Sequence, residues 1–592
     1  MAAGLTANAL RVLEARYLRR DSHGRIVETP EQLFQRVARA VSAAELLYGT
    51  AADAQRWEAR FLEMCASLDF LPNSPTLMNA GTALGQLSAC FVLPVDDTME
   101  SIFGTLRDMA LVQRTGGGTG FSFSRLRPAG DLVASTGGAA SGPVSFMRIY
   151  DCATENIKQG GRRRGANMGV LRVDHPDIDE FIGAKRDGGT LRNFNISVGA
   201  TDEFMAAVES GGETLVRHPA DGRALGRRPA QPLFNSICEA AWATGDPGVV
   251  FLDTLARGNP TPALGAIETT NPCGEVPLLP HESCNLGSIN LAHLAVERDG
   301  RAALDWERLR GLVLDGIRFL DDVIGVNRFP TGESERVTAG NRKVGLGVMG
   351  FAELCILLGI PYGAAEAVRF AGELMRFIAA EARSASAQLA EERGGFPNWQ
   401  HSAHAGAGPR LRNATQTSIA PTGTISIIAD TSSSIEPLFA LAYRRTNVLD
   451  GRPLVELNPL FVRALERRGA DHPKILDLVQ RTGRLGEAPG VPRDVRRLFM
   501  TALEIPPEQH VRIQAAFQRH VDNAVSKTIN LAHDSTPGDI AQAYLLAHRL
   551  GCKGVTVFRY GSKEQQVLEL GMGEEPYEHE HYARCDPGAC RL

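Results

Sequence analysis

Hydrophobic residues recur at helical spacing near both ends of the chain. Over 33–41 they return every three or four positions, directly after TPEQ at 29–32, which has the pattern of a capping box with proline at the first helical position. A second helix is predicted at 537–550, because Gly551 ends the periodic pattern there. The apolar, β-branched run at 554–560 then predicts a strand.

Between these ends, short apolar runs alternate with helical segments. The runs LSACFVLPV, FVRALERR, TSIAPTGTISIIAD and GVTVFRY are typical of strands, and such alternation favours an α/β architecture with a mostly parallel sheet. After Gly561 the sequence is polar, acidic and without a period, which is typical of a mobile tail. We therefore predict a helical region at 1–69, an α/β domain at 70–560 and a flexible tail at 561–592.

Composition narrows the class of protein. The 592 residues are 43% hydrophobic and 22% charged, as in a large globular protein. A net charge of −5 is small for this length, so neither nucleic acid nor an anionic membrane is expected as a partner. The chain has no long apolar run and its start lacks the features of a secretion signal, so we expect a cytoplasmic protein.

The number and spacing of the cysteines indicate reactive thiols or buried core residues rather than a scaffold of structural disulfides. Ten cysteines are too few for a disulfide framework in a chain of this length. None forms a CxxC pair and no Cys/His cluster has zinc spacing, so no metal site is predicted. Cys585 and Cys590 lie in the predicted tail, where disordered segments rarely keep thiols.

Glycine-rich segments suggest places where the backbone approaches a neighbour. GLGVMG at 345–350 matches a dinucleotide fingerprint, but the residues before it make a poor strand, so this interpretation is weak. TGGGTG at 115–120 and STGGAASG at 135–142 are predicted turns. PTGTI at 421–425 follows the strand-like segment 415–419 and opens a predicted helix, where its hydroxyls and N–H groups would suit a phosphate.

The side chains best suited to catalysis lie in the motif NPCGE at 271–275. Asn271, Cys273 and Glu275 alternate along a predicted extended loop and would project to one side, and Cys284 follows in SCNLG. A sulfur, a carboxylate and an amide would then share one small volume and could serve radical or nucleophilic chemistry. No histidine is placed to activate Cys273, so spacing alone does not decide between these two uses.

An ordered series of motifs resembles the catalytic chains of ribonucleotide reductases. The series is FLPNSPTLMNAG, LSACFVLPV, GGGTGFSFSRLRPAG, GGRRRGANMGVL, NPCGEVPL, SCNLGSINL, VGLGVMGF, PTGTISIIADTSSSIEP and a Cys-x4-Cys tail. The resemblance covers essentially residues 1–592. It implies a ten-stranded α/β barrel of the ribonucleotide reductase and glycyl-radical type, with a central finger loop that carries Cys273 and a helical region before it.

The resemblance also implies roles for single residues. Cys273 matches the thiyl-radical cysteine that takes the 3′-hydrogen of the ribose, Glu275 the base for the 3′-hydroxyl, and Asn271 the amide that holds the ribose hydroxyls. Cys90 and Cys284 match the pair that becomes a disulfide as the 2′-hydroxyl leaves as water. The tail pair, Cys585 and Cys590, matches the thiols that reduce this disulfide and pass the oxidation to thioredoxin, glutaredoxin or a dithiol.

Substrate and effector positions follow in the same way. The substrate is expected to be a ribonucleoside diphosphate, or less readily a triphosphate, and the matched positions are Ser74, Ala89, Cys90, Gly118, Asn271, Glu275, Pro421, Thr422, Gly423, Thr424 and Ile425. Two loops, 131–142 and 159–167, resemble those through which a bound dNTP or ATP effector selects the base. The candidate residues in these loops, or directly beside them, are Asp131, Lys158, Gln159, Arg163 and Asn167. Specificity regulation of this kind implies a homodimer.

Family members obtain their radical in three ways. Chains that receive it from an iron or manganese partner subunit carry adjacent tyrosines near the end of the barrel, where this sequence reads VFRY at 557–560. Glycyl-radical members carry an RxCGY-like loop, which is absent here. The resemblance therefore favours the class that uses adenosylcobalamin. A catalytic subunit that needs a metal-radical partner, or a nucleotide-binding regulator without turnover, remain the alternatives.

Overall fold

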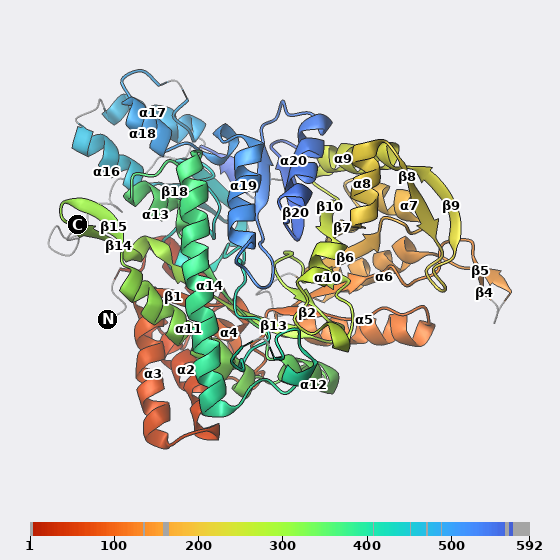
Figure 1. Cartoon of the computed structure of the whole chain (residues 1–592). Coiled ribbons are helices and arrows are strands. Elements are labelled where there is room, and N and C mark those ends of the chain that lie inside the picture. The colour runs from red at the N-terminus through yellow and green to blue at the C-terminus, as the bar shows by residue number, and fades with distance from the viewer. Residues whose placement is uncertain are drawn as a thin grey trace.

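A ten-stranded sheet runs through the centre of the molecule and helices surround it (Figure 1). The structure is a computed structural model that describes residues 4–133, 137–157, 165–406, 408–449, 452–468, 472–486, 488–562 and 568–571. The strands of the central sheet are β1 (Phe70–Pro72), β2 (Cys90–Val92), β3 (Gly118–Ser122), β6 (Asn167–Arg172), β7 (Phe194–Ala200), β10 (Gly248–Phe251), β13 (Ser283–Asn290), β16 (Val344–Met349), β19 (Thr528–Leu531) and β20 (Gly554–Arg559).

The sheet consists of parallel sets that meet in antiparallel pairs. β2, β3, β6, β7 and β10 are parallel to one another, as are β13 with β16 and β19 with β20. The sets meet antiparallel at β2–β13 and at β10–β20. The predicted mostly parallel sheet is therefore confirmed, with two antiparallel junctions between its parallel sets and β1 antiparallel to β13.

The segment 415–419 closes the sheet into a barrel. It is not the regular strand that its sequence predicts, but it bridges Leu346 of β16 at Thr417 and Val525, just before β19, at Ile419. Backbone hydrogen bonds of 2.8–3.1 Å join it to both neighbours. Gly347 of β16 faces this segment, and a Cβ there would collide with the carbonyl of Ser418. The glycines of GLGVMG therefore belong to the barrel wall.

A short hairpin occupies the barrel interior. Its strands are β11 (Thr269–Thr270) and β12 (Pro277–Leu278), so its tip is the NPCGE motif. Val276 and Leu278 pack in a small apolar cluster with Cys90, Cys284 and Leu286 from the surrounding wall. The hairpin is thus the central finger that the resemblance implies.

The other small sheets lie outside the barrel and contain β4 (Leu132–Val133), β5 (Gly138–Ala139), β8 (Glu213–Arg217), β9 (Ala224–Pro229), β14 (Ala295–Arg298), β15 (Arg301–Leu304), β17 (Ala442–Leu449), β18 (Arg452–Leu457) and β21 (Leu568–Leu570).

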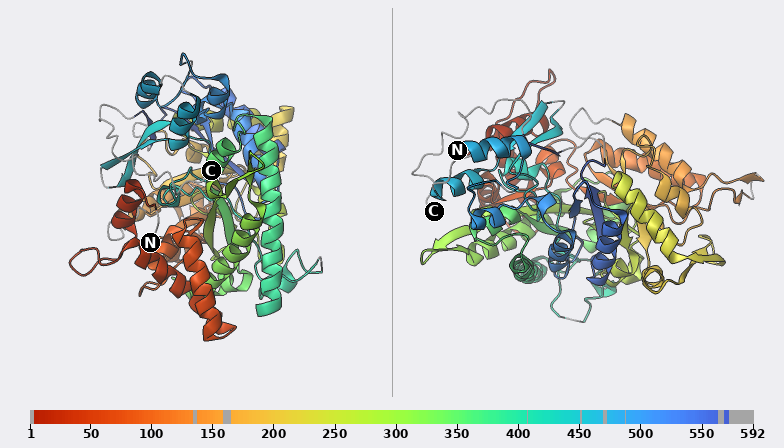
Figure 2. Two further views of the ribbon diagram at one scale, coloured as in Figure 1. Left: turned by 90° about the vertical axis from the view of Figure 1, so that its left-hand side faces the viewer. Right: turned by 90° about the horizontal axis from the view of Figure 1, so that it is seen from above.

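Helices cover the outside of the barrel. The N-terminal helices α2 (Pro30–Ser42) and α3 (Ala51–Ala66) pack against the long helix α11 (Trp306–Val326), which packs against the long helix α14 (Ala365–Arg393), as seen in Figures 1 and 2. The capping box at Thr29 and the start of α20 at Pro537 are as predicted. FVRALERR, predicted as a strand, lies in α16, because its apolar residues also fit helical spacing. The helices are α1 (Ala7–Arg16), α2 (Pro30–Ser42), η1 (Ala43–Leu47), α3 (Ala51–Ala66), α4 (Ser74–Asn79), α5 (Met99–Arg114), α6 (Pro143–Asn156), α7 (Ile178–Gly183), α8 (Asp202–Ser210), α9 (Ala230–Thr244), α10 (Leu252–Arg257), η2 (Pro262–Leu264), η3 (Leu291–Leu294), α11 (Trp306–Val326), α12 (Gly332–Asn341), α13 (Phe351–Leu357), α14 (Ala365–Arg393), η4 (Trp399–His401), α15 (Ile425–Ile428), α16 (Pro459–Arg468), α17 (His472–Thr482), α18 (Arg493–Leu498), η5 (Ala502–Glu504), α19 (Pro507–Gln518) and α20 (Pro537–Arg549).

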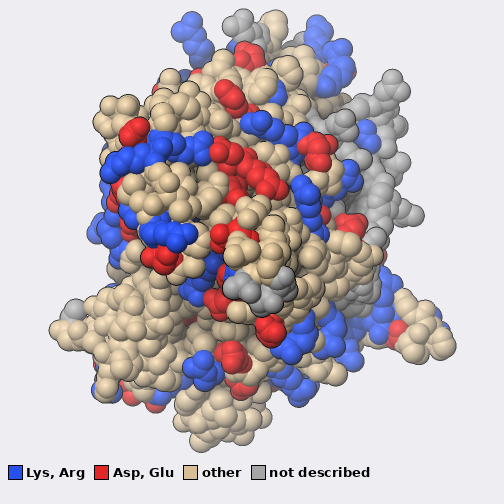
Figure 3. All heavy atoms as spheres, turned by 90° about the vertical axis from the view of Figure 1, so that its right-hand side faces the viewer, with Lys and Arg blue, Asp and Glu red and all other residues tan. Residues whose placement is uncertain are grey.

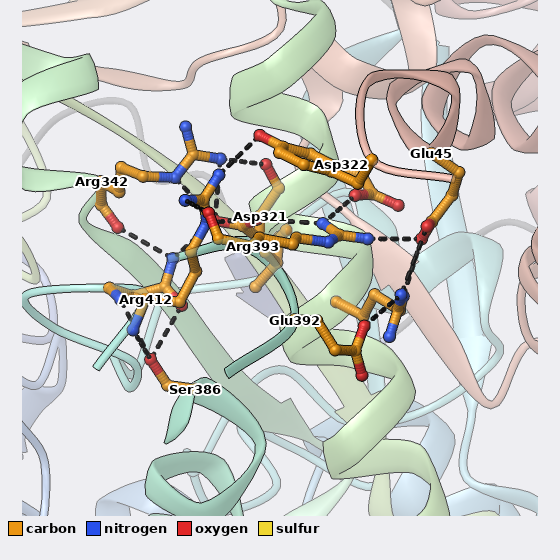
Figure 4. Close-up of polar contacts among 12 residues, drawn as sticks. Glu45, Asp321, Asp322, Arg342, Ser386, Glu392, Arg393 and Arg412 are labelled. Carbon is orange, nitrogen blue, oxygen red and sulfur yellow. Dashed lines mark hydrogen bonds and ion pairs between the residues drawn. The ribbon is translucent and has the colours of Figure 1, made fainter. Parts of the chain in front are cut away.

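A buried group of charges ties the N-terminal helices to the barrel (Figure 4). Arg393, at the end of α14, has a fully buried side chain that contacts Glu45 of η1 at 2.6 Å. Its other nitrogen lies 2.6 Å from Asp322 and 3.1 Å from Asp321, both on α11. One guanidinium therefore joins three elements that are far apart in the sequence.

The two aspartates of this group differ in their surroundings. Burial alone would raise the pKa of Asp321, but the charges of Arg342, Arg412 and Arg393 hold it below its usual value. Burial raises the pKa of Asp322 well above its usual value, although Arg393 opposes this. Both depend on Arg393, so its loss would leave buried carboxylates poorly compensated.

Charges of opposite sign are mixed on one face of the molecule. On the face that carries β8 and β9, Lys and Arg side chains alternate with Asp and Glu (Figure 3). Several of them pair, as Arg228 does with Asp179 at 2.7 Å. Among the helices that the structure describes, none combines the length and the apolar character needed to cross a membrane.

Candidate active site

The finger tip is a tight turn. The amide of Asn271 donates to the carbonyl of Val276 at 3.2 Å, and the amide of Gly274 donates to the carbonyl of Asn271 at 3.1 Å. Gly274 has a φ of +85°, which suits a residue without a Cβ. The predicted extended loop is therefore wrong. Asn271, Cys273 and Glu275 still face one cavity, because the turn gathers them.

The barrel wall has glycines where the finger lies against it, and their lack of a side chain leaves room for the finger. A Cβ on Gly118 of β3 would lie 2.8 Å from the ring of Pro272. A Cβ on Gly120 would collide with the backbone carbonyl of Thr270. The turn predicted at 115–120 is wrong in its second half, because 118–122 is a buried strand whose glycines let the finger lie against it.

Three hydrogen bonds fix the finger from outside. The side-chain amide of Asn195, on β7, donates to the carbonyl of Pro272 at 2.8 Å. The carbonyl of Glu275 accepts from the hydroxyl of Ser418 at 2.9 Å and from the amide of Ala524 at 2.8 Å. The residues on both sides of Cys273 are therefore held by different parts of the barrel.

A cavity of about 290 Å³ opens beside the finger tip. All of the substrate positions that the resemblance gives line it, including Cys90 and residues 421–425. Cys273 is exposed, whereas Glu275 and Asn271 are each 2% exposed. The cavity is lined by Arg16, Tyr17, Asn73, Ser74, Met78, Ala89, Cys90, Gly117, Gly118, Ala166, Asn271, Pro272, Cys273, Glu275, Leu286, Gly287, Ser288, Ala420, Pro421, Thr422, Gly423, Thr424 and Ile425.

Cys90 and Cys284 lie directly opposite each other on antiparallel strands. The register of β2 and β13 pairs their Cα atoms. Opposite residues in such a pair are about 4.5–5.5 Å apart at Cα, which falls within the range of about 4.4–6.8 Å that a disulfide needs. Cys90 borders the cavity and Cys284 is fully buried behind it. Burial raises the pKa of the Cys284 thiol above its usual value, so it is protonated at neutral pH.

Asn271 connects the finger to this thiol pair. Its side-chain nitrogen lies 3.1 Å from the sulfur of Cys90, and its side-chain oxygen accepts from the amide of Val276 at 2.9 Å. The amide group is therefore oriented by the finger itself and reaches the wall of the cavity beside Cys90.

Residues 421–425 form one rim of the cavity. A helix begins at Ile425, as predicted, but α15 is only four residues long. Thr422 has a φ of +54°, and its hydroxyl accepts from the amide of Ser434 at 2.7 Å. A Cβ on Gly423 would meet no atom within 4 Å, so this part of the rim is open.

The predicted effector residues either are not among those that line the cavity or fall outside the described residues. Asp131 is hydrogen-bonded to His218 at 3.1 Å, which lowers the pKa of its carboxyl. Asn167 is buried at the start of β6, where its side chain bonds Gln113 and Thr119. The positions outside the described residues are Lys158, Gln159, Arg163, Cys585 and Cys590.

Comparisons with known proteins agree with this geometry. The family model of the ribonucleotide reductase barrel domain matches residues 88–410 and 408–558, and that of the all-alpha domain of the same family matches residues 3–85. The chain belongs to the ribonucleotide reductase family. The ten-stranded barrel with its finger is thus the ribonucleotide reductase fold.

Individual ribonucleotide reductases resemble the whole chain. A vitamin B12-dependent ribonucleoside-diphosphate reductase of Mycobacterium tuberculosis (strain CDC 1551 / Oshkosh) is 53% identical, over 95% of this chain and 80% of the relative. One from Thermoplasma acidophilum is 49% identical, over 96% of this chain and 81% of the relative. The alpha subunit of the class Id reductase of Actinobacillus ureae has the same fold, with a TM-score of 0.76 at 22% identity, over 94% of this chain and 97% of that one.

Sequence reasoning missed part of this reductase cavity. Asn73 lies in FLPNSPTLMNAG, so the motif itself could have indicated it. Arg16 and Tyr17 end a helix whose sequence carries no such motif. The hydroxyl of Tyr17 lies 2.8 Å from that of Ser74, so this helix end is fixed to the cavity wall.

We expect Gly120→Ala to lower kcat about 100-fold, because a Cβ at this position would push the finger from its place and misplace Cys273. The melting temperature should also fall, because the collision overpacks the barrel interior, so turnover is compared at a temperature where both proteins are folded. The measurement is turnover beside a melting curve. Gly104→Ala is the matched control, because its Cβ would meet nothing within 4 Å. Normal turnover in Gly120→Ala would contradict the role of the glycine wall.

Proposed function

We propose that the chain reduces ribonucleoside diphosphates to 2′-deoxyribonucleoside diphosphates with adenosylcobalamin as cofactor, and so supplies DNA synthesis. The observation that carries the proposal is the cavity beside the finger, where Cys273, Glu275 and Asn271 face Cys90 with Cys284 behind it. The names of the relatives from Mycobacterium tuberculosis and Thermoplasma acidophilum support the same reaction and the same cofactor. We expect the protein to act in the cytoplasm.

The residues at the finger tip fit a large cofactor that meets Cys273 from outside. Cys273 is exposed, and a Cβ on the neighbouring Gly274 would meet nothing within 4 Å, so the finger tip has open space around it. Within the described part of the chain, no group of three or more His, Cys, Asp or Glu side chains could hold a metal ion. A corrinoid brings its cobalt already coordinated in its ring and does not require such a group. When bound, adenosylcobalamin supplies the one-electron oxidation of the Cys273 thiol.

Cys273, Glu275 and Asn271 would act on the ribose together. The oxidised sulfur of Cys273 takes the 3′-hydrogen atom, and the carboxylate of Glu275 accepts the proton of the 3′-hydroxyl. Asn271 holds the reacting hydroxyls with its amide. The hydrogen bonds that fix both flanks of Cys273 support this, because radical transfer between a thiol and one carbon requires a fixed approach.

Cys90 and Cys284 would supply the two electrons of the reaction. The C2′–O bond breaks and the hydroxyl leaves as water, while a C2′–H bond forms and the two thiols become one disulfide. The 3′-hydrogen then returns from Cys273, which regenerates its sulfur radical. The protonated state of Cys284 suits a thiol that must deliver hydrogen. Cys585 and Cys590 would reduce the disulfide by thiol exchange and pass the oxidation to thioredoxin, glutaredoxin or a dithiol.

The substrate would lie between the finger and the rim at 421–425. The ribose then faces Glu275, and the phosphates meet the hydroxyl and N–H groups of the rim, with Ser74, Ala89 and Gly118 around the nucleotide. Their common place in one cavity supports these assignments.

Regulation by a bound dNTP or ATP would act through the loops at 131–142 and 159–167, and would require a homodimer. Exposed apolar side chains on the helices beside these loops support such an interface. Met99 and Phe103 lie one turn apart on α5 and are 56% and 44% exposed. Ile149 on α6 and Leu132 on β4 are also exposed. Burial of these side chains would stabilise a dimer.

Turnover without a second protein tests the proposal. The chain is incubated anaerobically with adenosylcobalamin, a ribonucleoside diphosphate, an effector and a dithiol, and cob(II)alamin and deoxynucleotide are measured. We expect both to form. Product only after addition of a metal-radical subunit would favour the partner-dependent class, and nucleotide binding without any product would favour a regulator.

A further inference from the structure

We propose that Arg16 is the residue that recognises the charge of the substrate's diphosphate. This inference rests on the proposed function and adds a specificity-determining residue to it. Among the described residues that line the cavity, Arg16 is the one lysine or arginine and Glu275 the one acidic residue. A ribonucleoside diphosphate is anionic at one end and neutral at its ribose, so these two charges define how it enters.

The position of Arg16 places its charge at the phosphate end. Arg16 is the last residue of α1, and α1 packs against α15, which follows the rim at 421–425. The rim itself contains no charged residue. Its hydroxyl and N–H groups can hold phosphate oxygens, but they do not neutralise them, and a four-residue helix adds little dipole. Arg16 supplies the missing positive charge.

The helix end that carries Arg16 is fixed, while the guanidinium itself is available. The neighbouring Tyr17 is 2% exposed and bonds Ser74 across the cavity wall, which holds the end of α1 in place. Arg16 is half-buried. Within the described residues its guanidinium makes neither an ion pair nor a hydrogen bond. A planar, permanently charged group of this kind suits bidentate contact with phosphate.

Arg16 and Glu275 together place opposite charges in the cavity. Glu275 would repel the diphosphate and Arg16 would attract it, so the nucleotide enters with its ribose at the finger. An uncharged nucleoside would lack this guidance. The charge therefore acts on binding and orientation rather than on the radical steps, and its removal should raise KM and leave kcat nearly unchanged.

The test compares Arg16→Gln, Arg16→Lys and Arg11→Gln, an exposed arginine on the same helix outside the cavity. Binding of CDP and of uncharged cytidine is measured by calorimetry at low and high ionic strength, beside turnover and thermal unfolding. We expect Arg16→Gln to weaken CDP binding about tenfold, as loss of one charge-assisted hydrogen bond does. Cytidine binding and kcat should not change, Arg16→Lys should restore part of the affinity, and Arg11→Gln should match the wild type.

Two outcomes would overturn the inference. One is CDP affinity in Arg16→Gln equal to that of Arg11→Gln. The other is an equal loss for CDP and cytidine, which would mean a structural effect of α1. Because binding is measured without turnover, a wild type that binds CDP through Arg16 but forms no product would contradict the proposed function alone.

Discussion

Cys273→Ser is expected to abolish deoxynucleotide formation. A serine hydroxyl has a much stronger bond to hydrogen than a thiol, so it cannot take up the radical and pass it on. The side chain is exposed beside the cavity, and serine is close to cysteine in size, so the replacement should disturb the finger little. Binding of the ribonucleoside diphosphate and the melting temperature should therefore match those of the wild type.

The measurement is anaerobic turnover with adenosylcobalamin, beside calorimetric binding of CDP. Cys152→Ser is the matched control, because Cys152 is also exposed but lies on α6 outside the cavity. It should retain activity. Product formed by Cys273→Ser above the background of a reaction without enzyme would refute the radical role of this sulfur.

Arg393→Leu is expected to destabilise the protein by about 3–5 kcal/mol, the usual cost when one partner of a buried ion pair is removed. Glu45, Asp321 and Asp322 would lose a shared cation at contacts of 2.6–3.1 Å. Asp322 would depend on protonation to remain buried, since burial already raises its pKa. The helices at the N-terminus would lose a principal link to α11 and α14 (Figure 4).

The expected result is a lower midpoint in urea unfolding followed by circular dichroism, and earlier proteolysis near η1. Arg481→Leu is the control, since its pair with Asp477 is 2.7 Å long but its side chain is 68% exposed. Exposed pairs contribute about 0–1 kcal/mol, so the control should unfold almost as the wild type does. Equal urea midpoints of Arg393→Leu and Arg481→Leu would mean that the carboxyl groups around Arg393 are already neutral in the folded protein.

Local features of the fold could be predicted from the sequence, because they depend on neighbouring residues. The capping box at Thr29 and the helix and strand after Pro537 follow from propensity and turn chemistry. Most residues of the cavity could be found through motifs, because each motif is a short run. The strand prediction for FVRALERR failed because its four apolar residues, two on each side of Arg463, fit a helix as well as a short strand.

Other features depend on distant partners and could not be predicted. The finger can lie against the barrel wall because Gly118 and Gly120, from another part of the chain, leave room for Pro272 and Thr270. Residues 415–419 lack regular strand pairing, yet they close the barrel through bridges to β16 and Val525. Arg16 reaches the cavity only because α1 packs on α15.

The pairing of β2 with β13 joins two strands that are far apart in the sequence. β2 is synthesised long before β13, and the edge of β2 that later bears the thiol partner stays open until then. Contacts across so long a stretch of sequence carry a loop-closure cost that slows folding. Cys90 and Cys284 come to lie opposite each other only where β13 has paired with β2, so a disulfide between them would report that this junction of the barrel has formed.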